Sequence, residues 1–279
     1  MDSFPAYAII QTQSFCNANC LICPYGDTRS DQPQGTMEHE VFLKIIDELA
    51  RHAETVRQVM PYLMNEPLLD AGLIEKIEYI RRRMPEVTIH LVTNGIGLND
   101  EVGPRLLASG LDSIKISMPG LYETTWRRTM RIDDCSRVLK RINRFVTLAR
   151  ERRGPDFAVV ALTKTPGYVS ERETNEFRKH WERKQVRHEI IEHPISRAGN
   201  VAMIPSPRHS RIKGCSSIWR EEMIHILYNG DVILCCMDWR REVVLGNVRE
   251  RSLAEIWNSS EYERVRDIIA GKEEAENDF

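Results

Sequence analysis

Short apolar runs rich in β-branched residues alternate with helix-like segments along most of the chain. The strand-like runs are Ala6 to Gln11, Val56 to Met64, Val87 to Val92, Ser113 to Met118, Phe157 to Thr163 and Arg187 to His193. Between them apolar residues recur at helical spacing, as in Leu73, Ile74, Ile77 and Ile80. Such alternation predicts parallel βαβ units with right-handed crossovers. We therefore predict an α/β fold in which six units favour a partial (β/α)6 TIM-like barrel, with a flat doubly wound sheet as the alternative.

The pattern changes after Ile204-Pro205-Ser206-Pro207, which is typical of a linker. Beyond it, Asn229-Gly230 separates two strand-like runs and predicts a β-hairpin. Ser252 and Glu255 have the spacing of a capping box at the start of a helix. We therefore predict two parts, a barrel over residues 1–205 and a small α+β extension over residues 206–279.

The charge balance and the apolar patterning argue against several classes of protein. The 39 basic and 41 acidic residues give a net charge of −2, without the basic excess that broad nucleic-acid binding needs. No apolar run approaches the ~20 residues of a membrane-spanning helix. The first residues, Met1 to Pro5, lack the basic and apolar parts of a signal peptide. We expect a cytoplasmic protein with neither nucleic acid nor membrane as a partner.

The cysteines are the best candidates for metal ligands. Six of the seven fall in two groups, and cytoplasmic thiols stay reduced, so a set of disulfides is not expected. The first group, Cys16, Cys20 and Cys23, has the spacing C-x3-C-x2-C just after the first strand-like run. Three thiolates on one loop can bind three irons of a cubane cluster and leave the fourth iron open. The alternative is a zinc knuckle completed by a residue such as His39. Cys135 is expected to be a core or surface thiol.

This loop resembles the signature of the radical S-adenosylmethionine (SAM) superfamily. Ile22 departs from that signature, because the family more often has an aromatic residue before the last cysteine. The resemblance implies a 4Fe–4S cluster on Cys16, Cys20 and Cys23 that cleaves SAM to a 5′-deoxyadenosyl radical. It also implies an electron donor such as flavodoxin or ferredoxin.

Further stretches resemble the SAM-binding motifs of the family, in the expected order. Met64-Asn65-Glu66-Pro67-Leu68 resembles a Gly-Gly-Glu-Pro-Leu motif whose acid binds the SAM ammonium group, although both glycines are replaced. Thr93-Asn94-Gly95 resembles the turn that contacts the ribose. In related enzymes a serine and an arginine bind the ribose and the carboxylate, and Arg127 is the alternative to Arg128. The resemblance thus implies cofactor-binding roles for Asn65, Glu66, Thr93, Asn94, Ser117 and Arg128.

The second cysteine group resembles the start of a SPASM or twitch extension, which carries an auxiliary iron–sulfur cluster. Cys215, Gly230 and Cys235 have the spacing C-x14-G-x4-C, and Cys236 is adjacent. The family normally completes this cluster with a C-x2-C pair, which does not occur before Phe279. The resemblance therefore implies at most one auxiliary cluster, with metal ligands among Cys215, Cys235 and Cys236. An unmetallated hairpin is the alternative.

We expect a small polar substrate, such as a sugar, an aminocyclitol or a nucleoside, because a cluster loop at residue 16 leaves no room for an N-terminal peptide-binding domain. The expected reactions are dehydrogenation, decarboxylation or epimerisation. Candidate catalytic residues are Tyr62, Glu192 and His193, with Ser196, Arg197 and Asn200 as further substrate-binding candidates. The alternatives are a peptide or protein maturase of the SPASM type and a non-catalytic metal-binding interaction module.

Overall fold

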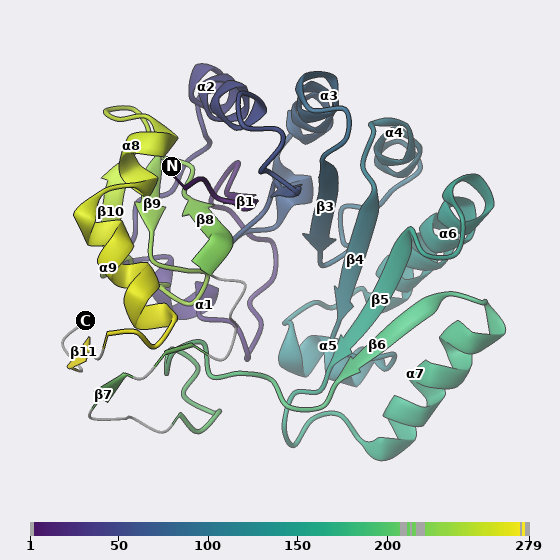
Figure 1. Cartoon of the computed structure of the whole chain (residues 1–279). Helices are drawn as coiled ribbons and strands as arrows, with labels where there is room; N and C mark the ends of the chain where they lie inside the picture. Colours follow the sequence, from purple (N-terminus) through teal and green to yellow (C-terminus); the bar gives the residue numbers. More distant parts are fainter. Residues whose placement is uncertain (1–2, 207–210, 213, 216–220, 274, 277–279) are drawn as a thin grey trace.

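The computed structural model describes residues 3–206, 211–212, 214–215, 221–273 and 275–276. Within these residues the main feature is a curved sheet in the order β10-β9-β8-β1-β2-β3-β4-β5-β6 (Figure 1). Neighbouring strands from β1 to β6 are parallel, which confirms the partial barrel predicted from the sequence. Their bounds are β1 (Tyr7–Ile10), β2 (Gln58–Met60), β3 (Thr88–Thr93), β4 (Ser113–Met118), β5 (Ala158–Thr163) and β6 (Arg187–Ile191).

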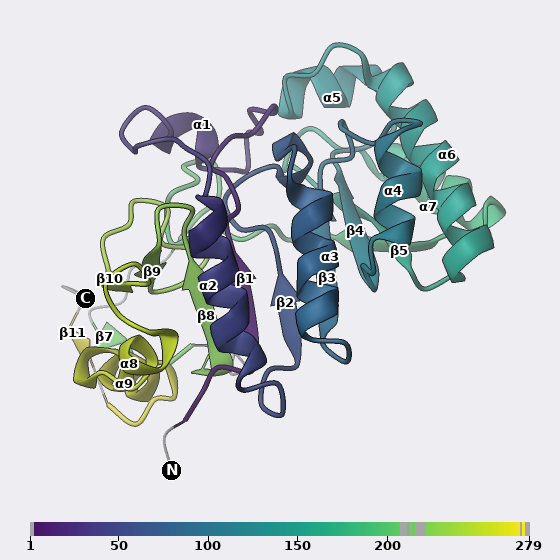
Figure 2. The same ribbon diagram turned by 90° about the horizontal axis from the view of Figure 1, so that it is seen from above.

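Helices cover the convex face of the sheet. Figures 1 and 2 show α2, α3, α4, α6 and α7 along the outside of the strands. Phe42 and Ile77 from this layer are fully buried in one core cluster with Ile10 and Ile89 of the strands. None of the described helices is long and apolar enough to cross a membrane. The helix bounds are α1 (Tyr25–Thr28), α2 (His39–Ala50), α3 (Leu73–Arg83), α4 (Val102–Ala108), α5 (Glu123–Thr129), α6 (Cys135–Arg153) and α7 (Glu171–Arg183).

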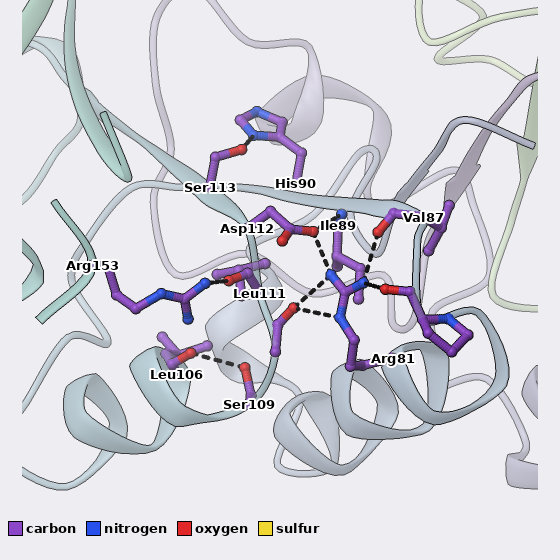
Figure 3. Close-up of polar contacts among 12 residues, drawn as sticks. Arg81, Val87, Ile89, His90, Leu106, Ser109, Leu111, Asp112, Ser113 and Arg153 are labelled. Atoms are coloured by element: carbon purple, nitrogen blue, oxygen red, sulfur yellow. Dashed lines mark hydrogen bonds and ion pairs between the residues drawn. The ribbon is translucent and has the colours of Figure 1, made fainter. Parts of the chain in front are cut away.

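Arg81 at the end of α3 fixes the register of the neighbouring strands (Figure 3). Its guanidinium donates to the carbonyl oxygens of Val87 and Gly110 and forms an ion pair with Asp112. The Asp112 carboxylate also accepts the backbone N–H of Ile89 at 2.7 Å. These bonds join α3, the start of β3 and the segment before β4, so the N-terminal ends of the two strands are tied to one helix.

The second strand differs from its prediction. It ends at Met60 and does not continue to Met64. Pro61 follows and has no N–H for the ladder, while the N–H of Tyr62 turns back to the carbonyl oxygen of Met60 at 2.9 Å. The prediction of a strand to Met64 was wrong for this reason, and residues 61–66 form a loop at the C-terminal end of β2.

The C-terminal region extends the barrel sheet. The predicted hairpin is confirmed, with β8 antiparallel to β9 and Gly230 at a φ of +93° in the turn. β8 is also parallel to β1, so the region continues the sheet on the side opposite β6. The predicted capping box of Ser252 and Glu255 is confirmed at α8. The bounds are β7 (Arg211–Ile212), β8 (Met223–Ile226), β9 (Asp231–Ile233), β10 (Val244–Asn247), α8 (Leu253–Trp257), α9 (Ser260–Ile269) and β11 (Ala275–Glu276).

Candidate active site

A buried carboxylate, Glu66, lies at the C-terminal end of the parallel strands. Its side chain accepts the hydroxyl of Thr93 at 2.6 Å and the backbone N–H groups of Asn94 and Leu68 at 2.7 and 3.0 Å. Glu66 is only 2% exposed, and a buried carboxylate needs such donors to offset its lost hydration. The loop after β2 and the turn after β3 are therefore joined through one carboxylate.

Burial raises the pKa of Glu66 to about 7, although its three hydrogen bonds act in the opposite direction. A cation placed beside the carboxylate would favour its ionised form and lower that pKa. The ammonium group of an amino acid is such a cation, so the site is matched to a positively charged ligand group.

Asn65 provides a second indication that a ligand belongs here. Its side-chain oxygen accepts the backbone N–H of Leu63 at 2.9 Å. Its buried Nδ2 has no hydrogen-bond partner among the described residues. An unsatisfied buried donor costs about 1–3 kcal/mol. A ligand that brings an acceptor to Asn65 Nδ2 and a cation to Glu66 would satisfy both groups, as the amino-acid part of SAM would.

The turn after β3 requires glycine at its third position. Gly95 has a φ of +76°, and a Cβ there would lie 2.8 Å from the side chain of Ile142. The Thr93 hydroxyl accepts the N–H of Gly95 at 3.0 Å while donating to Glu66. The Asn94 side chain donates to Asn17 Oδ1 at 2.8 Å and so reaches the cysteine loop.

The cysteine loop is held against this network by backbone contacts. The N–H of Glu66 donates to the carbonyl oxygen of Phe15 at 2.9 Å, and Gln13 Nε2 donates to the carbonyl oxygen of Glu66 at 2.7 Å. The N–H of Cys16 donates to the hydroxyl of Tyr25 at 2.9 Å. The structure thus brings the first cysteine group, the Glu66 loop and the Thr93–Asn94 turn together, as the sequence predicts.

The three thiols of the loop are half-buried. Burial raises the pKa of Cys16 to about 12 and also raises the pKa values of Cys20 and Cys23. Metal binding must therefore release protons here. No group of three or more His, Cys, Asp or Glu side chains in the described residues converges on one metal ion. A cubane cluster needs no such convergence, because each thiolate binds a different iron.

Helix α5 joins the cysteine loop from the other side. The N–H of Leu21 donates to the carbonyl oxygen of Thr129 at 2.8 Å, and that of Asn19 donates to Met130 at 3.2 Å. The helix carries both arginine candidates. Arg127 forms ion pairs with Glu123 and Asp133 at 2.6 and 3.1 Å on the exposed surface.

Arg128, in contrast, has its guanidinium 4.7 Å from the centre of the Tyr168 ring. Among the described residues, the ion pairs at this helix involve Arg127 and not Arg128. Arg128 therefore has its charge available for a carboxylate, and the choice between the two arginines favours Arg128. Ser117, the other predicted contact on this side, is half-buried near the end of β4.

Glu173 holds α5 in place from α7. Its carboxylate accepts the N–H groups of Leu121 and Tyr122 at 2.7 and 2.8 Å and the hydroxyl of Thr125 at 2.7 Å. The residue is 1% exposed, and a Cβ at Gly120 would lie 2.2 Å from its Oε1. Sequence reasoning missed this residue, because a glutamate in the first turn of an amphipathic helix is usually a solvated dipole partner.

The second cysteine group lies on the C-terminal region. The N–H of Cys215 donates to the carbonyl oxygen of Ile269 at 2.9 Å, at the end of α9. Cys235 Sγ accepts the N–H of Met237 at 3.4 Å. Burial raises the pKa values of Tyr262 and Tyr62, and Cys235 and Cys236, respectively, raise them further.

The predicted substrate residues fall in two places. Tyr62 is half-buried, and its ring meets the His90 ring in a T-shaped arrangement at a centroid distance of 6.2 Å. Glu192 forms ion pairs with Lys164 at 2.7 Å and Arg178 at 3.6 Å, and His193 beside it is exposed. No polar contact among the described residues joins Glu192 or His193 to Tyr62.

The other polar candidates lie in the segment after β6. Asn200 donates to the carbonyl oxygen of Arg197 at 2.8 Å and accepts Arg240 Nε at 3.2 Å. Ser196 accepts the N–H of Gly199 at 3.3 Å. This segment therefore contacts the loop that follows Cys235 and Cys236.

Comparison with known families identifies the class of protein. A model of the radical SAM superfamily matches residues 10–169, and a model of an iron–sulfur cluster-binding domain (SPASM) matches residues 215–278. The first match covers more than half of the chain, which therefore belongs to the radical SAM superfamily. The family resemblance is confirmed, and the finding favours an enzyme over the non-catalytic metal-binding module. Its cofactors are a 4Fe–4S cluster and SAM, and SPASM domains bind auxiliary iron–sulfur clusters.

Individual relatives match only parts of this chain. GTP 3′,8-cyclase of Paenarthrobacter nicotinovorans is 41% identical over 24% of this chain and 18% of its own length. GTP 3′,8-cyclase of Clostridium perfringens is 28% identical over 50% of this chain and 42% of its own length. The matched stretches thus span less than half of these curated relatives.

Solved structures match nearly the whole chain. The structure of BtrN in complex with AdoMet and 2-DOIA is 15% identical, covers 98% of this chain and 90% of its own, and gives a TM-score of 0.64. Streptococcus suis SuiB bound to precursor peptide SuiA is 14% identical, covers 95% of this chain and 67% of its own, and gives a TM-score of 0.71. At these identities the likeness shows the fold alone.

Proposed function

We propose that this enzyme takes a hydrogen atom from a small polar substrate, such as a sugar, an aminocyclitol or a nucleoside, in a dehydrogenation, decarboxylation or epimerisation. When bound, the cluster and SAM supply a 5′-deoxyadenosyl radical through one-electron cleavage of SAM. We assign the cluster to Cys16, Cys20 and Cys23. The proposal is carried by one observation: the cysteine loop, the Glu66 carboxylate and the turn after β3 meet at the C-terminal ends of parallel strands.

The residues around the cluster loop would bind and orient SAM. Glu66 would bind the ammonium group through a charge-assisted hydrogen bond in a site that excludes water. Asn65 Nδ2 and the Arg128 guanidinium would donate to the carboxylate, which Arg recognises through its planar fork. Thr93, Asn94 and Ser117 would contact the ribose.

Three residues are proposed to act on the substrate. Tyr62 has the best support, because it is half-buried next to His90. Glu192 and His193 would act from the rim, since Glu192 is held by Lys164 and Arg178 and His193 is exposed.

The substrate class has support from the fold likeness. BtrN, solved with AdoMet and 2-DOIA, matches over 98% of this chain, which favours a small ligand in a chain of this size. The second candidate is a peptide maturase, favoured by the TM-score of 0.71 with SuiB, which was solved with a precursor peptide. A screen of SAM cleavage with small polyols against peptides separates the two.

The C-terminal region would hold the auxiliary cluster. We assign residues 1–205 to the barrel and residues 206–279 to this region, with Cys215, Cys235 and Cys236 as candidate ligands. The matched SPASM segment begins at residue 215 and supports this division. The electron would come from a donor such as flavodoxin or ferredoxin, and a cytoplasmic setting would keep the thiols reduced.

Anaerobic reconstitution tests the proposed chemistry. The protein is loaded with iron and sulfide, then given SAM and dithionite, and 5′-deoxyadenosine is measured. The triple variant Cys16→Ala, Cys20→Ala, Cys23→Ala is expected to form none. Cys135→Ala is the matched control, because Cys135 is a buried thiol at the start of α6 and not part of the C-x3-C-x2-C loop. Wild-type protein with a full first cluster but no 5′-deoxyadenosine would contradict the proposal.

A further inference from the structure

The concave face of the sheet has two unlike halves. Because side chains alternate across a strand, the residues between core-facing positions point to this face. On β1, β2 and β8, Ile9, Met60 and Met223 occupy such positions and are buried in one apolar cluster, and the buried His225 shares this face of β8. On β3 to β6 the concave positions include the half-exposed residues His90, Val92, Lys115, Ser117, Val159 and Glu189. The β3–β6 half is therefore polar and accessible to a ligand, whereas a closed barrel fills its interior with packed side chains.

Lys115 and Glu189 form an ion pair on this polar half. Lys115 Nζ lies 2.8 Å from Glu189 Oε2, with the side chains 32% and 38% exposed. The two residues come from β4 and β6, so the pair crosses β5, where Ala161 is the register partner of Glu189. A pair this exposed contributes at most about 1 kcal/mol to folding. Stability alone therefore gives little reason for two charges on the inner face of a barrel.

His90 and Ser113 add a neutral hydrogen-bonding pair beside these charges. His90 Nδ1 lies 2.8 Å from Ser113 Oγ, on the side of the strands away from Arg81 and the helices (Figure 3). Burial and the nearby Lys115 lower the pKa of His90 to about 4, so the imidazole is neutral at pH 7. The Tyr62 ring packs against this imidazole in a T-shaped arrangement.

The charges of the pair decide which ligands fit. Lys115 and Glu189 neutralise each other, so the pair attracts neither a phosphate ester nor a cation strongly. A phosphate near Lys115 would be repelled by Glu189, and an ammonium near Glu189 would be repelled by Lys115. Two neighbouring hydroxyl groups suit both residues, because one oxygen accepts from the ammonium of Lys115 and the next O–H donates to the carboxylate of Glu189.

We propose that Lys115 and Glu189, with His90 beside them, recognise adjacent hydroxyl groups of an uncharged polyol ring, such as a cyclitol or a sugar. This deepens the proposed function and depends on it, because the site serves a substrate that lies inside the barrel. Lys115 and Glu189 are specificity-determining residues in this account, and neither takes part in the cleavage of SAM.

The test measures ligand preference with defined probes. Ring-deuterated inositols and hexoses, a hexose phosphate and an amino sugar are each added to the reconstituted protein with SAM and dithionite. Two readouts are taken: the increase in 5′-deoxyadenosine over the level without probe, and deuterium transfer into it. The variants are Glu189→Gln, Lys115→Gln and Lys115→Arg, each checked for folding by circular dichroism. Asp100→Asn, which removes an exposed ion pair with Arg144, is the control.

At least one neutral polyol is expected to raise 5′-deoxyadenosine formation by about tenfold or more and to transfer deuterium. Glu189→Gln leaves Lys115 unpaired and should shift the preference toward the hexose phosphate by about tenfold. Lys115→Gln should shift it toward the amino sugar, while Lys115→Arg and Asp100→Asn keep the wild-type preference.

Two results would overturn the inference while leaving the proposed function intact. One is 5′-deoxyadenosine formation that no neutral polyol stimulates. The other is a preference that stays unchanged in both folded glutamine variants. A different result would contradict the proposed function itself: the wild type would form no 5′-deoxyadenosine, with or without a probe.

Discussion

The two cysteine groups differ in how the rest of the protein supports them. The first is fixed on several sides: Tyr25 bonds Cys16, Asn94 bonds the side chain of Asn17, and the end of α5 bonds Leu21. The second lies in the C-terminal region, where the contacts of the described residues include one backbone bond from Cys215 to the end of α9. Elements of the barrel bond the first loop directly, whereas the second group lies among the hairpin, the end of α9 and the segment after β6.

Removing the second cysteine group is expected to have the largest effect, and it tests whether the two groups act as separate cluster sites. The double variant Cys215→Ala, Cys235→Ala is expected to lose a whole cluster, so that the iron content falls from about eight to about four per chain. The first cluster should still change its electron paramagnetic resonance signal when SAM is added. A wild-type count near four would mean that the second group holds no cluster, and loss of the SAM-dependent signal would show that the two sites are coupled.

Glu66→Gln tests whether the first site is built around a charge. The change keeps the shape of the side chain but removes the charge-assisted bond that we propose Glu66 makes to the SAM ammonium. The affinity for SAM should fall roughly 30- to 100-fold, about 2–3 kcal/mol, in equilibrium dialysis with radiolabelled SAM. Glu75→Gln, which affects only an exposed ion pair with Arg105, is the matched control. Equal affinities for the two variants would rule out a role of Glu66 in binding the ammonium.

Glu173→Gln tests the support that reaches the first site through α5. The amide cannot replace all three acceptor bonds, so the free energy of unfolding should fall by about 2–3 kcal/mol in urea titrations. SAM affinity should fall with it, because α5 carries Arg128. Glu176→Gln on the same helix loses surface bonds to Tyr122 and Arg172 and should change stability much less than Glu173→Gln. Similar losses in both variants would mean that α5 does not depend on Glu173.

The raised pKa of Glu66 gives the first site a pH dependence. The folded protein keeps this proton up to about pH 7, whereas the usual value is 4.5, so the carboxyl lowers stability as pH rises from about 4.5 to 7. In the proposed site, bound SAM would reverse this preference, because its ammonium would favour the ionised carboxylate. SAM affinity should rise about tenfold from pH 6 to 8 and stay flat over that range in Glu66→Gln. An equal rise in both proteins would assign the effect to another group.

Gly95→Ala tests how tightly the turn after β3 is packed. The residue has a φ of +76° and no room for a Cβ beside Ile142, so the substitution should cost about 2 kcal/mol of stability. Gly167→Ala, with a φ of +77° and open space around it, has the backbone strain without the clash. The difference between the two melting curves measures the clash alone, and no difference would mean that Ile142 moves aside.

The sequence by itself determined the superfamily of the protein and most of the barrel. Cys16, Cys20 and Cys23 lie close together in the sequence, so their spacing can be recognised without knowing the fold. Apolar periodicity also located β4, which has the predicted bounds, and Asn229-Gly230 located the hairpin. The spacing of a motif and the periodicity of apolar residues depend only on residues that are close in the chain. A single sequence is therefore enough to recognise them.

Only the tertiary structure decided which distant residues meet. Lys115 and Glu189 are 74 positions apart, and their pairing requires β4 and β6 to flank β5. The adjacent arginines also have different partners. Arg128 lies over the Tyr168 ring, whereas Arg127 forms ion pairs with Glu123 and Asp133. A period of two shows which residues share a face of a strand, but strand order and side-chain direction decide which of them form a site.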